Sequence, residues 1–306
     1  MSGGPEKLKG RVLRTVGGVY EVEVGGATLE CALRGRLKRV RGIGRVAVGD
    51  EVEIERLADG SCVITELLPR RARLSRRSAD GRREQIIAAN VDRLAAVFSV
   101  ARPAPVFELL DRFLVLAESS EIAAFIVVNK IDLAAADEVG GRFALYDEIG
   151  YAVVYTSAKA RCGLDELGDR LADHITLFVG PSGAGKSSLL NVLQPGLELR
   201  VGAISEAIER GRHTTVAAAL HRLDLGGYVV DTPGLGKVQF WEVGTHELAW
   251  CFPEFRPYLG RCKFQDCSHT HEPGCAVVAG LEAGELSSRR YASYVKFLGE
   301  SSGRGS

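Results

Sequence analysis

The run Gly180-Pro-Ser-Gly-Ala-Gly-Lys186-Ser187 decides how this chain folds. It matches the phosphate-binding pattern G-x-x-x-x-G-K-[ST], and it stands between the apolar run Ile175–Val179 and the helix-forming run Ser187–Leu193. A strand, a glycine-rich turn and a helix in this order point backbone N–H groups at a phosphate, and Lys186 then reaches the outer phosphates. We expect a continuous stretch to contact the phosphates, namely Gly180, Pro181, Ser182, Gly183, Ala184, Gly185, Lys186, Ser187 and Ser188.

Apolar runs around this loop predict a parallel sheet. The runs are Arg93–Val100, Ala123–Val128, Ala152–Thr156, Ile175–Val179 and Tyr228–Val230. Near-continuous apolar strands that alternate with helices, such as the amphipathic run Val106–Ser119, are typical of a sheet covered on both faces. The central part of the chain is therefore predicted to be an α/β unit.

Two motifs that follow strands of this sheet indicate a guanine nucleotide. Asn129-Lys-Ile-Asp132 places a carboxylate that can accept hydrogen bonds from both N1–H and the exocyclic amine of guanine, which adenine cannot offer. Thr156-Ser-Ala-Lys159 can support the base through a backbone N–H, although alone it is also a plausible helix cap. The residues expected at the guanosine end of the ligand are Asn129, Lys130, Asp132, Ser157, Ala158 and Lys159.

The segment Asp231-Thr-Pro-Gly234 ends the last strand of the sheet. An acid there can hold Mg²⁺ through water, and the Gly234 N–H can meet the γ-phosphate. Alone the four residues could form an ordinary turn, but with a phosphate-binding loop upstream they indicate a nucleotide-sensing segment.

The order of these motifs is unusual. The guanine motifs at 129–132 and 156–159 precede the phosphate-binding loop at 180–187, whereas an ordinary GTPase begins with that loop. Joining the old termini and opening the chain elsewhere leaves the strand packing unchanged. We therefore expect a circularly permuted GTPase unit.

A second sensing segment, Gly211-Arg-His-Thr-Thr215, lies between the loop and Asp231. With the Ser187 hydroxyl, Thr214 or Thr215 could ligate Mg²⁺ and sense the γ-phosphate. Many GTPases place a water-orienting glutamine where this chain has Leu235, which cannot serve. His213 is then the nearest titratable candidate for catalysis, and a structural loop histidine is an equally good interpretation.

A cluster of cysteines near the C-terminus predicts a metal site. Cys262, Cys267, His269 and Cys275 follow the spacing C-x₄-C-x-H-x₅-C and supply a closed tetrahedral set for a structural Zn²⁺. His271 is a competing imidazole. The other cysteines stand singly in apolar segments, where we expect packed side chains: Cys31, Cys62, Cys162 and Cys251.

The N-terminal part is predicted to be a small barrel. Five short runs with alternating polarity and glycine turns fall within residues 10–68, which suits an oligonucleotide-binding barrel and permits an SH3-like one. A basic run between two of these strands carries the arginines and lysine expected to bind RNA, namely Arg34, Arg36, Lys38, Arg39 and Arg41. A second basic run, Arg70–Arg83, marks the exit from the barrel.

Composition narrows the class of protein. The chain has 306 residues, 46% hydrophobic and 25% charged, with 39 basic and 39 acidic residues, which suits two or three globular domains. Residues 1–90 carry 18 of the basic and 12 of the acidic residues, so this part has a net charge of +6 although the whole chain is neutral. No run long enough to span a bilayer and no apolar leader are present, so we expect a cytoplasmic protein. Seven cysteines, an odd number, argue against a secreted disulfide framework.

The combination closely resembles the circularly permuted, small-ribosomal-subunit-dependent GTPases of the ribosome biogenesis GTPase A family. The resemblance rests on the residues quoted above at 129–132, 180–188, 211–215, 231–234 and 262–275. One departure is Gly236-Lys-Val238, where the family has an Arg-Glu-Phe type of run.

This resemblance implies an oligonucleotide-binding domain at 1–74, a permuted GTPase domain at 75–243 and a mostly helical zinc-binding domain at 244–306. It also implies GTP and GDP as ligands, Mg²⁺ with GTP, and late maturation of the 30S subunit, with 16S rRNA as the contact. We expect a monomer with no membrane partner. An alternative is a GTP-sensing RNA-binding regulator with negligible turnover.

Overall fold

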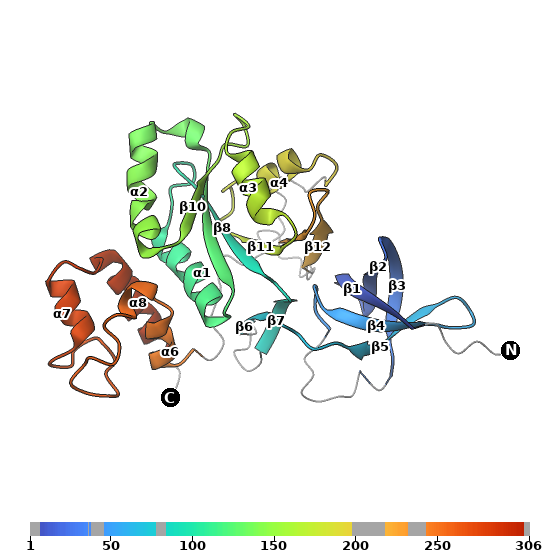
Figure 1. Cartoon of the computed structure of the whole chain (residues 1–306), viewed down its shortest axis with the longest axis horizontal. Coiled ribbons are helices and arrows are strands. Elements are labelled where there is room, and N and C mark those ends of the chain that lie inside the picture. Colours follow the sequence, from blue (N-terminus) through green and yellow to red (C-terminus); the bar gives the residue numbers. More distant parts are fainter. Residues whose placement is uncertain are drawn as a thin grey trace, which may run out of the picture.

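The computed structural model describes residues 7–35, 37, 46–77, 84–197, 218–231 and 243–302. In Figure 1 the chain runs from an N-terminal barrel, through a central sheet flanked by helices, to a C-terminal group of helices. In the described part of the chain, none of the helices has the length and apolar character needed to cross a bilayer.

The N-terminal barrel closes on itself in the order β1-β2-β3-β5-β4-β1. Its strands are β1 (Lys7–Val16), β2 (Val19–Val24), β3 (Ala27–Leu33), β4 (Glu51–Arg56) and β5 (Cys62–Leu67). Strands β3 and β5 pair in parallel, and every other pair in the barrel is antiparallel. This closed five-stranded order confirms the prediction of a barrel of the oligonucleotide-binding type rather than an SH3-like barrel.

Apolar and polar residues alternate along the barrel strands, so that one face of each strand packs in the interior of the barrel. Val12, Val22, Val52, Ile54 and Ile64 point inward and are at most 1% exposed. Charged residues on the outer surface of these strands form cross-strand ion pairs, such as Lys7–Glu53.

The central sheet has the order β10-β9-β8-β11-β13-β12. Its strands are β8 (Arg93–Ser99), β9 (Ala123–Asn129), β10 (Ala152–Tyr155), β11 (Ile175–Val179), β12 (Ala219–Arg222) and β13 (Tyr228–Asp231). All are parallel except β12, which runs antiparallel to β13. Strand β12 was not predicted, because its run Ala219-Leu-His-Arg222 is short and half of it is polar.

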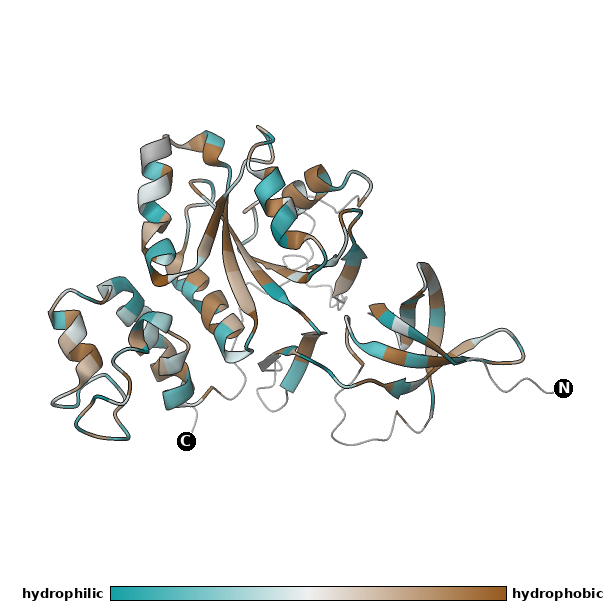
Figure 2. Ribbon diagram, in the orientation of Figure 1, coloured by the Kyte–Doolittle hydropathy of each residue, from teal (hydrophilic) through white to brown (hydrophobic). Residues whose placement is uncertain are grey.

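Helices cover both faces of this sheet, as predicted. They are α1 (Phe107–Ser119), α2 (Ala136–Ile149), α3 (Leu164–Leu171) and α4 (Lys186–Leu193), with a 3₁₀ turn η1 (Ile131–Leu133). Leu94, Ala96 and Phe98 of β8 pack in one cluster with α1 and α2, whereas Ala95 and Val97 pack with α3 and α4. Figure 2 shows the resulting band of hydrophobic residues along the central strands.

A two-stranded ribbon joins the barrel to this sheet. It consists of β6 (Arg73–Arg77) and β7 (Glu84–Ala89), which pair antiparallel. At its end, the Ala89 N–H donates to the Val48 carbonyl (2.9 Å) and the Asn90 side-chain amide donates to the Gly49 carbonyl (3.0 Å). Backbone of the barrel and backbone of the ribbon are thus hydrogen-bonded directly.

The C-terminal part is mostly helical, as expected. Its elements are α6 (Thr245–Trp250), the 3₁₀ turn η3 (Pro253–Phe255), α7 (Ala276–Glu282) and α8 (Ser288–Ser302). Phe252, Phe255 and Tyr294 form its centre, with ring centroids 5.1–5.5 Å apart. This aromatic core is small, so it is not expected to fix the conformation of the long segment between η3 and α7 by itself.

A buried ionic network attaches α8 to the central sheet through α1. Arg290 of α8 and Asp111 of α1 are both fully buried and lie 2.7 Å apart, and Glu254 holds the other side of the guanidinium at 2.6 Å. The hydroxyl of Tyr146 in α2 donates to the same Asp111 carboxylate. The opposite charges of Asp111 and Glu254 raise the pKa of Arg290 even though burial opposes this. A charge buried this deeply requires its partners.

Replacing Arg290 with alanine should lower the free energy of unfolding by about 3–5 kcal/mol, because Asp111 would remain buried without its cation. Urea denaturation measures this. Lys296→Ala is the matched control, since it removes the exposed Lys296–Glu108 pair between the same two helices and should cost less than about 1 kcal/mol. Equal destabilisation by the two variants would contradict the importance of the buried network.

Candidate nucleotide site and metal centre

The phosphate-binding loop lies at the carboxyl end of β11, between this strand and α4. Gly180 has φ +145°, and a Cβ there would lie 2.0 Å from the Val97 carbonyl oxygen of the neighbouring strand. Gly185 has φ +97°, and a Cβ there would lie 2.2 Å from the Asn129 side-chain nitrogen. Only glycine fits at both positions, so the spacing of the motif follows from close packing beneath the loop.

Lys186 folds back into this loop. Its Nζ donates to the carbonyl oxygens of Gly180 (2.8 Å) and Pro181 (3.0 Å), and burial lowers its pKa. Asp231 ends the adjacent strand β13, and burial raises the pKa of its carboxyl against the opposing effects of His221 and Lys186. A half-buried ammonium that is held by two carbonyl oxygens at the start of a helix is suited to an anionic ligand.

Side chains of the motif at the end of β9 donate hydrogen bonds to the backbone of the phosphate-binding loop. The buried Asn129 amide donates to the Ala184 carbonyl (2.9 Å). The Lys130 ammonium donates to the carbonyls of Gly183 (2.7 Å) and Arg102 (2.6 Å). Two motifs about fifty residues apart therefore form one site, as their positions at parallel strand ends predict.

The third loop, after β10, completes the guanine side of the site. The Ser157 hydroxyl donates to Asp132 Oδ1 (2.5 Å), and the Ala158 N–H donates to Asn129 Oδ1 (3.3 Å). Ser157 is buried, whereas Asp132 and Lys159 are exposed. The Asp132 carboxylate is oriented by a neighbour and remains accessible to a base.

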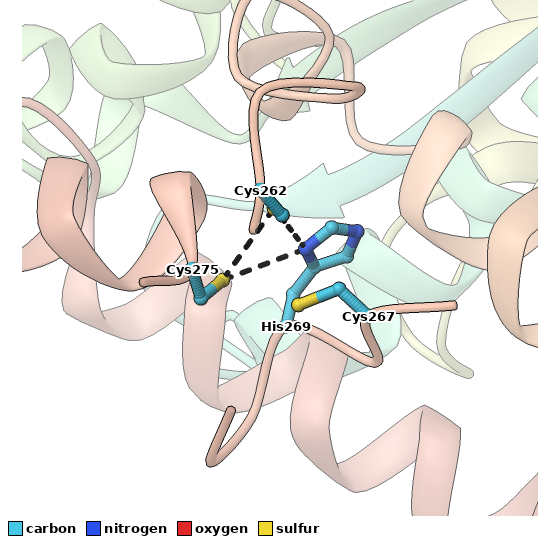
Figure 3. A group of neighbouring side chains, drawn as sticks. All are labelled: Cys262, Cys267, His269 and Cys275. Atoms are coloured by element: carbon cyan, nitrogen blue, oxygen red, sulfur yellow. Dashed lines mark hydrogen bonds between the residues drawn. The ribbon is translucent and has the colours of Figure 1, made fainter. Parts of the chain in front are cut away.

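Four side chains near the C-terminus converge on one point (Figure 3). Cys262, Cys267, His269 and Cys275 each offer a ligand atom, and these atoms all lie within 4.8 Å of one another. His269 Nδ1 is 3.4 Å from Cys262 Sγ and 3.5 Å from Cys275 Sγ, and the two sulfurs are 4.0 Å apart. In tetrahedral zinc thiolate sites, ligand atoms are separated by about 3.5–3.8 Å. The spacing in this chain is therefore suited to a bound metal ion.

The hydrogen bonds to these sulfur atoms and the burial of Cys267 also suit a bound metal ion. Backbone N–H groups of Ala276 and Val278 donate to the Cys262 and Cys275 sulfurs, as second-sphere donors to thiolates do. Burial raises the pKa of the Cys267 thiol to about 12, so a cation is needed to hold it as the thiolate at neutral pH.

Comparisons with known proteins agree with this geometry. The family model described as RsgA GTPase matches residues 67–241, and the one described as RsgA N-terminal domain matches residues 9–64. The chain belongs to the RsgA GTPase family.

Curated RsgA relatives match over nearly the whole chain. Small ribosomal subunit biogenesis GTPase RsgA from Gemmatimonas aurantiaca is 47% identical, covering 96% of this chain and 98% of the relative. The protein of the same name from Moorella thermoacetica is 44% identical, with 96% and 97% covered. GTP hydrolysis is the activity that goes with membership of this family.

Solved structures show the same architecture. YjeQ from Thermotoga maritima has a TM-score of 0.81 at 36% identity, covering 98% of this chain and 100% of that one. YloQ, described as a circularly permuted GTPase, has a TM-score of 0.74 at 31% identity, with 98% and 97% covered. The permutation inferred from motif order is thus confirmed for this RsgA family member.

Several residues singled out in the sequence lie outside the described residues. They are His213, Thr214, Thr215 and Gly234 of the sensing segments, and Arg36, Lys38, Arg39 and Arg41 of the basic run. Arg34 is described, and its guanidinium pairs with Glu55 at 2.7 Å. In the second basic run, Arg70 pairs with the buried Asp50 and Arg71 with Asp92. The positive charge of these three arginines is therefore partly compensated within the protein.

The structure confirms the predictions for most of the cysteines and contradicts the prediction for one of them. His269, not His271, joins the metal-ligand group, and Cys31, Cys62 and Cys251 are buried as expected. Cys162 is exposed, so the prediction that it packs in an apolar environment was wrong. It lies in the loop after β10, where the backbone pairs with Ser157 and leaves the side chain outside.

The carbonyl of Arg102, which accepts from Lys130, was not predicted, because a backbone acceptor leaves no side-chain signature. The buried pair of Asp111 and Arg290 was not predicted either, although an acid at a core-facing position of an amphipathic helix is a signal for the first of them.

Replacing Asp132 with asparagine should lower affinity for GTP by roughly 10- to 100-fold, because a bidentate acceptor of two guanine donors is lost. Affinity for xanthosine triphosphate should rise, since its 2-carbonyl can accept from the new amide. Fluorescent-nucleotide titration measures both affinities. Equal affinities of the unaltered protein for ATP and GTP would contradict the assignment of this residue.

Replacing Cys267 with alanine should remove the bound metal and make residues 244–302 sensitive to protease, because metal binding and folding of this part are linked. Metal analysis of protein purified without chelators, together with limited proteolysis, measures both effects. Cys162→Ala is the control, since this exposed thiol lies outside the cluster and its loss should leave the metal in place. A Cys267→Ala protein that keeps metal and resistance would refute the site.

Proposed function

We propose that this chain hydrolyses GTP in the late maturation of the small ribosomal subunit. The observation that carries the proposal is the joining of the guanine motif to the phosphate-binding loop. Asn129 and Lys130 hydrogen-bond the backbone of Ala184 and Gly183, which leaves Asp132 exposed beside them for a base. The subunit itself is suggested by the relatives, whose printed name is small ribosomal subunit biogenesis GTPase.

The nucleotide contacts follow from this arrangement. Residues 180–188 hold the phosphates, Asn129, Lys130 and Asp132 with residues 157–159 hold the guanosine, and Asp231 and Gly234 sense the γ-phosphate. Mg²⁺ accompanies GTP, with the Ser187 hydroxyl and Thr214 or Thr215 as ligands. The place of Asp231 at the end of β13, beside β11, supports a water-mediated contact with this ion.

We assign a structural role to the metal and zinc as its identity. Four protein ligands close the coordination shell, so no position remains for a reacting water. Three thiolates and an imidazole are the donor set that Zn²⁺ favours, and the separations described above suit it.

The barrel and its basic run are the proposed contact with 16S rRNA. Oligonucleotide-binding barrels use loops beside such a barrel, and arginine and lysine neutralise phosphates. Arg34 pairs with Glu55, and the proposed contact also includes Arg36, Lys38, Arg39 and Arg41 of the same basic run. The proposed domains remain 1–74, 75–243 and 244–306, in a monomer that works in the cytoplasm, where ribosomes are assembled.

Hydrolysis requires a group that orients water, and Leu235 cannot provide one. His213, in the sensing segment, is the candidate that the sequence offers. A bound subunit could place this residue, so slow turnover alone and faster turnover on the subunit are expected together.

Adding small ribosomal subunits should stimulate GTP turnover, and His213→Ala should reduce the stimulated rate by about 100-fold while nucleotide and subunit binding persist. Phosphate release with small, large or no subunits measures this. A variant as fast as the unaltered protein would exclude a catalytic His213. Absence of turnover under every condition would instead favour a GTP-sensing regulator that does not hydrolyse.

A further inference from the structure

The barrel joins the central sheet by strand pairing at the hairpin formed by β12 and β13. Arg14 of β1 pairs with Ala219 at the start of β12, and Ala219 in turn lies opposite Asp231 at the end of β13. In sequence, β12 directly follows the sensing segment that holds Thr214 and Thr215, and β13 leads into Asp231-Thr-Pro-Gly234. Both nucleotide-sensing segments therefore join the strands that the barrel contacts.

Glu23 contacts both strands of this hairpin. This residue of β2 is only 11% exposed, and it uses both carboxylate oxygens. One oxygen accepts from Arg222 at the end of β12 (2.8 Å), and the other accepts from the hydroxyl of Tyr228 at the start of β13. Arg222 and Tyr228 are themselves opposite one another in the hairpin, so a single side chain of the barrel holds both strands.

Two further residues, Arg11 and Gln194, contact the same corner. The guanidinium of Arg11, in β1, lies 5.0 Å above the Tyr228 ring. Gln194, just beyond the end of α4, donates to the Arg222 carbonyl (3.3 Å) and accepts from the Asp224 N–H (2.7 Å). Helix α4 begins at Lys186, so the corner held by Glu23 also contacts the far end of the helix that starts at the phosphates.

The C-terminal helices are attached on another side of the sheet. Their buried network joins Arg290 to Asp111 of α1, and α1 packs with β8 and β9. In the order of the strands, β8 is separated from β12 by β11 and β13. Of the two flanking parts, the barrel is the one whose polar contacts fall on the strands next to the sensing segments.

We propose that Glu23 is a positioning residue through which the barrel sets the β12–β13 hairpin, and thereby the residues that respond to the γ-phosphate. RNA bound by the barrel then favours the GTP-bound arrangement, and GTP favours RNA binding by the same factor. This inference rests on the proposed function, since the RNA is that of the small subunit. A barrel bound in the same way to both arrangements would produce no such coupling.

The test measures coupling rather than stability. Affinity for a non-hydrolysable GTP analogue and for GDP is determined with and without small subunits, and stimulated turnover is followed in parallel. In Glu23→Ala, we expect nucleotide affinity without subunits to stay within about twofold of the unaltered protein. The preference of the subunit for the GTP state should fall by about fivefold or more, the lower end of typical allosteric couplings.

Matched variants separate the contact from general damage to the barrel. Glu21→Ala removes an acid from the same face of β2, two residues from Glu23, and should leave the coupling unchanged. Tyr228→Phe removes one hydroxyl and should reproduce part of the loss without disturbing the barrel. Exchanging the charges in Glu23→Arg with Arg222→Glu should restore coupling that either change alone abolishes.

The outcomes distinguish the two proposals. If subunits neither bind nor stimulate the unaltered protein, the proposed function fails and this inference fails with it. If the unaltered protein is stimulated and Glu23→Ala and Tyr228→Phe show the same coupling and turnover, the function stands and the role of Glu23 is refuted. Loss of coupling in Glu21→Ala to the same extent would also refute it, because the effect would then come from surface charge.

Discussion

The hydrogen bonds from Asn129 and Lys130 to the backbone of the phosphate-binding loop are the constraint on which the nucleotide site depends. They join the ends of β9 and β11, two strands that lie on either side of β8. Gly185 must be a glycine because the Asn129 amide occupies the space of a side chain. The segment with the predicted guanine motif and the phosphate-binding loop are therefore joined by packing, and the permuted order of the motifs leaves that packing intact.

The parts attached to this sheet are held by different kinds of interaction. The C-terminal helices depend on a charge network in which Arg290 and Asp111 are fully buried, and it tolerates little rearrangement because each buried group needs its partners. The barrel contacts β12 and β13 through polar side chains, and the partner of Glu23 on β12, Arg222, has a side chain that is 62% exposed. Exposed polar pairs exchange readily with water, so this junction is the better suited to respond to a ligand.

The cluster of Cys262, Cys267, His269 and Cys275 lies in a part of the chain that has little core of its own. Between η3 and α7 the backbone follows loops and turns, and the four ligands come from this stretch and from the residue before α7. Tyr291 and Tyr294 of α8 donate to the carbonyls of His269 and Ser268, so helix and ligand loop support one another. Metal binding can thus stabilise the same helix that carries Arg290.

The sequence by itself determined the local chemistry of this protein. The glycines of 180–185, the acid at 132 and the four ligands at 262–275 are specified by residue type and spacing, because each chemistry tolerates few substitutes. The five-strand barrel, the parallel sheet and the permutation followed from periodicity and motif order, and they were confirmed.

Only the tertiary structure decided which distant residues meet. The edge strand β12, the pairing of Arg34 with Glu55, the exposure of Cys162 and the burial of Arg290 against Asp111 depend on neighbours far along the chain. So does the contact of Glu23 with Arg222 and Tyr228, which are about two hundred residues away. The physical reason is that a charged side chain has the same local pattern whether it ends in water or in an ion pair, and only packing distinguishes the two.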